Sequence, residues 1–178
     1  MPDPTDPTPV RRIVTGDGPD GLSRIISDAP APISRRVAER PGYLVSNLWA
    51  MKLSDGPAAE DRAPSLAGIL PPAGGSVLRV IDFPPEPEDP AARQKMMAAT
   101  FGGIFSDADH RGGKHPGMHV TRTVDYAIVL AGEIWAILDA EETLMRAGDI
   151  LIQRGTSHAW ANRSRASARI AFILIDTP

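Results

Sequence analysis

Two histidines and one aspartate stand in segments whose residue pattern is typical of β-strands. His119 and Asp125 belong to the segment 117–130, and His158 belongs to the segment 157–163. Side chains alternate between the two faces of a strand, so residues of one parity share a face. The pattern therefore predicts that His119 and Asp125 point the same way. Two imidazoles and one carboxylate in an enclosed site suit either divalent-metal ligation or acid–base chemistry.

Neighbouring residues on the same strands are candidates for binding a substrate. Thr121 shares the parity of the first histidine, and Trp160 shares the parity of the second. An arginine would hold a substrate carboxylate through two parallel hydrogen bonds. Arg122 has the wrong parity for this face, whereas Arg154 lies at a turn beside the second segment. We therefore predict Thr121, Arg154 and Trp160 as substrate-binding residues.

The composition limits the class of protein. A chain of 178 residues suits one domain with a real hydrophobic core. A net charge of −3 and a pI near 5.8 argue against a nucleic-acid partner. No stretch approaches the ~20 apolar residues of a membrane span, and residues 1–10 have no apolar signal-peptide core. The absence of cysteine excludes disulfides, thiolate ligands and a cysteine nucleophile, and it favours a cytoplasmic location.

Short strand-like segments separated by turn residues predict an all-β fold. With 18 prolines and 16 glycines, the chain has many turns and little room for long helices. We expect a helix over 91–101, loops over 55–68 and 102–114, and edge strands within 11–30. Strands are expected at 42–53, 75–83, 117–130, 133–139, 142–146, 149–153, 157–163 and 167–175. The expected organisation is a disordered tail (1–10), an arm of strands packed on a barrel (11–69) and the barrel itself (70–178).

The two histidine segments resemble the two sequence motifs of the cupin superfamily. The first motif is a glycine, five residues, His-x-His, three or four residues, a glutamate, six residues and a glycine. Its counterparts here are Gly113, His119, Thr121, Asp125 and Gly132. Thr121 therefore replaces the second histidine, and Asp125 replaces the glutamate.

The second motif is a glycine, five residues, Pro-x-Gly, two residues, a histidine, three residues and an asparagine. This chain has Gly148, then Arg154-Gly155-Thr156 in place of the proline turn, then His158 one residue early and Asn162 in register. We expect Asn162 to hold a turn rather than to catalyse. The match covers roughly a third of the chain.

The resemblance implies a cupin jelly-roll β-barrel with N-terminal extension strands and one or two short helices. Cupin metal sites commonly use three histidines and one glutamate. Carried over, the set is His119, Asp125 and His158, with one ligand lost to Thr121. His115 could substitute for it. The implied cofactor is either none or one divalent ion (Fe, Zn, Ni or Mn), and pairing of cupins through N-terminal arms implies a homodimer.

The sequence leaves three functions of the protein open, and each of them involves a small-molecule substrate or ligand. The first is an enzyme of lyase or isomerase type, with dehydratase-like acid–base chemistry on a hydroxy- or oxo-compound. The second is a metal-dependent iron dioxygenase. Both would use His119, Asp125 and His158 as catalytic residues. The third is a non-catalytic ligand-binding cupin.

Overall fold

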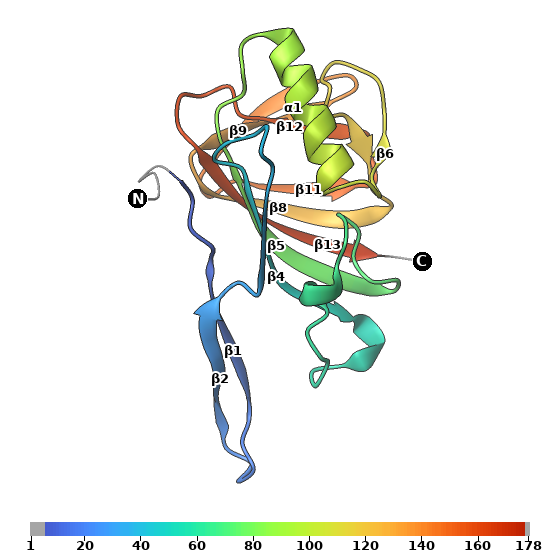
Figure 1. The fold of residues 1–178 in the computed structure, drawn as a ribbon. Helices are drawn as coiled ribbons and strands as arrows, with labels where there is room; N and C mark the ends of the chain where they lie inside the picture. Colours follow the sequence, from blue (N-terminus) through green and yellow to red (C-terminus); the bar gives the residue numbers. More distant parts are fainter. Residues whose placement is uncertain (1–5, 177–178) are drawn as a thin grey trace.

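Two antiparallel sheets face one another in the structure, a computed structural model that describes residues 6–176 (Figure 1). One sheet has five strands in the order β10 (Glu142–Arg146), β9 (Glu133–Leu138), β12 (His158–Ala161), β7 (His119–Val120) and β6 (Asp109–His110). The other has six strands in the order β11 (Ile150–Arg154), β8 (Thr123–Ala131), β13 (Ala168–Asp176), β5 (Gly75–Phe83), β4 (Leu44–Lys52) and β3 (Ile33–Arg36). The expected all-β jelly-roll barrel is confirmed.

The segment 117–130 is not the single strand that the sequence predicted. It is divided into β7 and β8, which belong to different sheets. Thr121 and Arg122 form the crossing between them. The parity argument that placed His119 and Asp125 on one strand face is therefore wrong in its premise. His119 and Asp125 come close together because the two sheets pack face to face, and each sheet contributes one of these residues.

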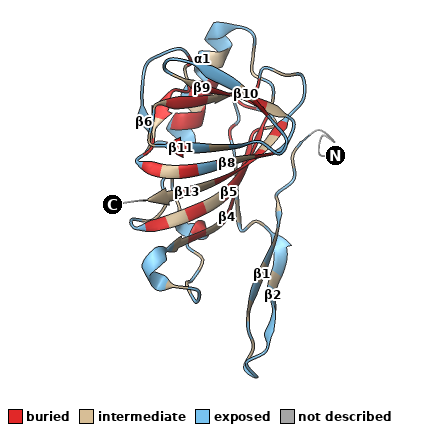
Figure 2. Ribbon diagram, turned by 180° about the vertical axis from the view of Figure 1, so that it is seen from behind, coloured by how far each residue is buried: buried red, intermediate tan, exposed pale blue. Residues whose placement is uncertain are grey.

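Residues 11–30 form a hairpin of their own rather than edge strands of the barrel. β1 (Arg11–Asp17) pairs with β2 (Ser23–Pro30) in a separate two-stranded sheet. This hairpin extends away from the barrel (Figure 1) and is largely exposed (Figure 2). Large apolar side chains lie exposed on it, namely Ile13, Leu22, Ile25 and Ile26.

The expected helix is present and slightly longer than predicted, as α1 (Pro90–Gly103). The Asp89 carboxylate caps it by accepting hydrogen bonds from the backbone N–H groups of Ala91 and Ala92, and Pro90 occupies the first turn. Its buried residues Met96, Met97, Thr100 and Phe101 face the barrel. The loop expected at 102–114 contains the short strand β6, and that expected at 55–68 includes the 3₁₀ turn Ala63–Ser65; another 3₁₀ turn spans Leu53–Asp55.

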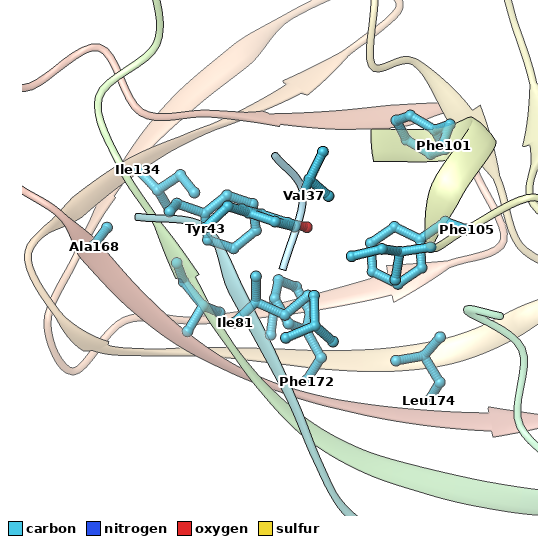
Figure 3. Packing of buried hydrophobic residues seen from close by; sticks show 14 of the residues in the cluster. Val37, Tyr43, Ile81, Phe101, Phe105, Ile134, Ala168, Phe172 and Leu174 are labelled. Atoms are coloured by element: carbon cyan, nitrogen blue, oxygen red, sulfur yellow. The ribbon is translucent and has the colours of Figure 1, made fainter. Parts of the chain in front are cut away.

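The hydrophobic core lies between the two sheets and under α1. Buried side chains concentrate on the barrel strands (Figure 2), and Figure 3 shows Tyr43, Ile81, Phe172 and Phe101 reaching into this interior. Within residues 6–176 no helix combines the length and apolar character needed to cross a membrane. The expected tail, 1–10, lies partly outside the described residues; residues 6–10 contain no helix or strand.

Candidate functional site

His119 and His158 lie side by side on the inner face of the five-stranded sheet. They are register partners of the β7–β12 pair, and their ring centroids are 4.3 Å apart. Nδ1 of His119 lies 2.9 Å from the carbonyl oxygen of Gly117, and Nδ1 of His158 lies 2.9 Å from that of Thr156. A carbonyl oxygen only accepts hydrogen bonds, so each Nδ1 carries a proton. In the neutral rings both Nε2 atoms are therefore hydrogen-bond acceptors.

Burial keeps both imidazoles neutral. Burial, and then the neighbouring His158, lowers the pKa of His119 to about 3. Burial also lowers the pKa of His158. Desolvation disfavours the charged form of an imidazole, and a second imidazolium beside it would add repulsion. Both imidazoles are therefore shifted below the pKa expected for a histidine general base, and His119 is shifted far below it.

Asp125 on β8 is the acidic group of the site. Its side chain is 5% exposed and accepts a hydrogen bond from the Thr121 hydroxyl, with 3.3 Å between Thr121 Oγ1 and Asp125 Oδ2. The other oxygen, Oδ1, is buried without a hydrogen-bond partner among the described residues. Burial raises the pKa of the Asp125 carboxyl to about 6. This carboxyl can therefore gain or lose a proton close to neutral pH.

One cavity, of about 60 Å³, brings these three side chains together. His119, Asp125 and His158 all line it. All four phenylalanines of the chain line it as well, together with Tyr43 and Trp160. A water needs roughly 15 Å³ of such space, so the cavity admits only a small molecule.

Two buried arginines also line this cavity, and the sequence analysis missed both. Arg79 on β5 is 1% exposed, and Arg40, which precedes β4, is 3% exposed. The sequence contained a signal for the burial of Arg79. It lies two residues from Val77 and from Ile81, so all three side chains share the inward face of β5. Arg40 lies in a turn region without such a periodic signal.

The predicted substrate-binding residues take different positions. Trp160 is half-buried, lines the cavity and packs edge-on against Phe172, with ring centroids 5.3 Å apart. Thr121 is buried, outside the cavity lining, and reaches the site through Asp125. Arg154 is exposed on β11 and does not line the cavity. Its predicted role in holding a substrate carboxylate is therefore corrected, since Arg154 is exposed at the end of β11 whereas its neighbour Gln153 is buried.

His115 and Asn162 have structural partners. His115 is buried with Nε2 3.1 Å from Oε2 of Glu86, and its Nδ1 accepts a hydrogen bond from the backbone N–H of Gly117. It does not substitute for the missing imidazole. The Asn162 amide donates to the carbonyl oxygens of Phe83 and Ala166, at 2.8 Å each. This confirms the prediction that Asn162 holds a turn.

The donor set does not fit a cupin metal site. Over residues 6–176, no group of three or more histidine, aspartate or glutamate side chains converges closely enough to hold an ion. The two imidazoles come from one sheet, and Asp125 comes from the other. The predicted three-ligand set of His119, Asp125 and His158 is therefore not assembled as a metal centre.

Comparison with known proteins relates the chain to fungal biosynthetic proteins. No family model matches it. It is 39% identical over 77 residues to the phomopsin biosynthesis cluster protein C′ of Diaporthe leptostromiformis, covering 42% of this chain and 41% of that protein. It is 30% identical over 106 residues to a cupin-domain-containing oxidoreductase of Neurospora crassa, covering 57% of this chain and 40% of that protein. The chain is therefore similar in sequence to a cupin-domain-containing protein.

The chain spans about two fifths of the length of the curated relatives it matches. Among solved structures it is similar to a putative ethanolamine utilization protein Q of Salmonella typhimurium, with 12% identity and a TM-score of 0.46 over 97% of this chain and 100% of that chain. It is also similar to the Cnp3 cupin domain of Schizosaccharomyces pombe, with 10% identity and a TM-score of 0.46 over 93% of this chain and 86% of that chain.

Proposed function

We propose that this protein is an acid–base enzyme of lyase or isomerase type that moves a proton on a small organic molecule. The observation that supports this most directly is the shared cavity. It places the unpartnered oxygen of Asp125 together with the two imidazole acceptors of His119 and His158. Groups of this kind, held around one small space, can remove and return protons without leaving the site.

Asp125 is the proposed proton carrier. A general acid or base works best when its pKa lies near the operating pH. The pKa of Asp125 is raised to about 6, whereas that of His119 is lowered to about 3. As a carboxylate, Asp125 removes a proton from the carbon beside a substrate carbonyl. The resulting acid returns that proton to another carbon in an isomerisation, or to a departing hydroxyl in a dehydration.

His119 and His158 are the proposed positioning groups. Their Nδ1 atoms are fixed on backbone carbonyls, so their Nε2 atoms accept hydrogen bonds in a defined direction. A substrate hydroxyl that donates to one of them is held in a fixed orientation. The aromatic lining limits the water in the cavity, which strengthens each of these polar interactions.

Hydrogen–deuterium exchange tests this proposal without knowledge of the full reaction. The chain is incubated in D₂O with 2-oxo acids, 3-hydroxy acids and conjugated aldehydes, and loss of the proton signal beside the carbonyl is followed by NMR. We expect exchange with at least one class. General acid–base groups contribute about 10²–10⁴-fold to rate, so Asp125→Asn should lower exchange by at least ~100-fold.

Asp139→Asn is the matched control, because Asp139 is exposed and outside the cavity lining. It should exchange at the rate of the unmodified chain. Exchange at the buffer rate throughout the panel would contradict the proposal, as would equal exchange by Asp125→Asn. The second outcome would favour a ligand-binding role for the cavity.

A second candidate function is an oxidoreductase, which the name of the Neurospora crassa relative favours. A metal-dependent dioxygenase would need a third donor beside His119 and His158, and the described residues do not supply one. Oxygen consumption after addition of Fe(II), over the same panel, separates the two candidates. Oxygen uptake that His158→Ala abolishes would replace the lyase proposal by this one.

A further inference from the structure

The cavity contains two cations that no acidic residue neutralises at close range. Neither Arg40 nor Arg79 forms an ion pair with any described residue. Asp125 is the single acidic residue of the lining, and it loses its charge below about pH 6. The lining therefore has a net positive charge throughout the range near neutral pH.

The guanidinium of Arg40 donates no hydrogen bond within the described part of the chain. Its Nε and Nη2 are buried and have no hydrogen-bond partner. Its Cζ stacks 4.1 Å above the ring of Tyr43 and 5.5 Å from the ring centroid of Phe83. Stacking fixes the plane of the guanidinium but satisfies none of its N–H donors.

Arg79 is only partly satisfied. Its Nη2 donates to the carbonyl oxygen of Ile69 at 2.8 Å, whereas its Nε is buried without a partner. Burial lowers the pKa of Arg79 to about 10 and also lowers the pKa of Arg40. Buried unpaired donors of charged groups are costly, so a native structure that retains three of them beside one cavity indicates a missing acceptor.

We propose that the cavity binds a small carboxylate with a planar, unsaturated body, whose carboxylate accepts hydrogen bonds from Arg40 and Arg79. A guanidinium matches a carboxylate in charge and geometry. The six aromatic side chains of the lining suit a flat carbon skeleton, and the volume of about 60 Å³ keeps that skeleton short. This inference rests on the proposed function, because it names the substrate class for the same cavity. The 2-enoic acid that forms when a 3-hydroxy acid loses water is of this class.

A matched pair of probes tests the charge requirement. Crotonate and crotonamide have nearly the same size and shape, but only crotonate carries a negative charge. Binding of each to the full chain is followed by NMR titration. Charge-assisted hydrogen bonds in a buried site make the affinities of two such ligands differ by at least about tenfold. Crotonate should therefore bind at least about tenfold more tightly than crotonamide.

Arg40→Met tests the residue assignment. The unbranched methionine fills much of the same space, and no hydrogen bond between described residues is lost. Crotonate affinity should fall at least about tenfold, crotonamide affinity should stay unchanged, and the melting temperature without ligand should not fall. Arg154→Met, which changes an exposed arginine outside the cavity, should leave both affinities unaltered.

The inference is overturned if crotonamide binds within about threefold of crotonate, or if crotonate binds more weakly than about 20 mM. It is also overturned if Arg40→Met folds and binds crotonate like the unmodified chain. If Arg40→Met does not fold, Arg79→Lys, which keeps the charge but loses the planar fork, should still weaken crotonate binding. Selective crotonate binding without deuterium exchange would retain this inference and refute the proposed function. Deuterium exchange without selective crotonate binding would retain the proposed function and refute this inference.

Discussion

The buried carboxyl of Asp125 predicts an unusual dependence of stability on pH. Its pKa is about 6 in the folded chain, against an ordinary value of 3.8. The folded state therefore holds this proton more tightly than the unfolded state. The resulting stabilisation is fully present below pH 3.8 and is lost as the pH rises through 6. A shift of about 2 units corresponds to ~3 kcal/mol, of which about 2 kcal/mol falls between pH 4 and pH 8.

Asp125→Asn removes this titration and keeps the shape of the side chain. The amide oxygen can still accept the hydrogen bond from Thr121, while the NH₂ group lies where Oδ1 has no partner. That packing cost is the same at every pH. Relative to the unmodified chain, the variant should therefore gain about 2 kcal/mol of unfolding free energy between pH 4 and pH 8, whatever its absolute stability.

Urea unfolding at pH 4, 6 and 8, followed by the fluorescence of the three tryptophans, measures this gain. Asp139→Asn, which removes an exposed carboxylate, controls for the loss of one charge. A stability difference between Asp125→Asn and the unmodified chain that is constant with pH would refute the raised pKa. A difference of opposite sign would show that the folded state stabilises the ionised carboxylate.

Three further predictions concern the binding of added metal, the β1–β2 hairpin and the turn held by Asn162. Thr121→His adds a third imidazole near the existing pair and should raise the affinity for Ni²⁺ in calorimetry; an unchanged affinity would show that this position cannot reach the pair. We propose that the exposed apolar hairpin pairs two copies of the chain, so Ile25→Ser combined with Ile26→Ser should convert a dimer to a monomer in light scattering. A monomeric unmodified chain at micromolar concentration would contradict this proposal. Asn162→Ala leaves two backbone carbonyls without their amide donor and should lower the unfolding free energy by about 2–4 kcal/mol in urea; a loss below ~1 kcal/mol would mean that water replaces the amide.

The fold could be predicted from short strands, turn residues and the two motif spacings, because these are local features of the sequence. The division at Thr121 and Arg122 could not, because nothing in the alternation of 117–130 marks a change of sheet. His119 and Asp125 line the same cavity for a reason different from the predicted one. A barrel brings together inward-facing residues of opposite sheets.

The arginines show where reasoning from residue type failed. A charged residue in a strand is usually exposed, so the alternation of Arg79 with Val77 and Ile81 was not read as burial. The structure buries it because backbone carbonyls accept from its Nη atoms. Conversely, Arg154 was preferred for its nearness in sequence to His158. The structure places Arg154 at the end of β11, where it is exposed and its neighbour Gln153 is buried.

The two sheets line the cavity with different polar groups, and this difference bears on the stereochemistry of a reaction in the cavity. The imidazole acceptors of His119 and His158 lie on one sheet, whereas Arg79 and Asp125 lie on the other. A flat ligand between them presents one molecular face to each wall. Since Asp125 reaches the ligand from one side only, a proton added to a trigonal carbon arrives on a single prochiral face. A reaction in this cavity should therefore give one enantiomer.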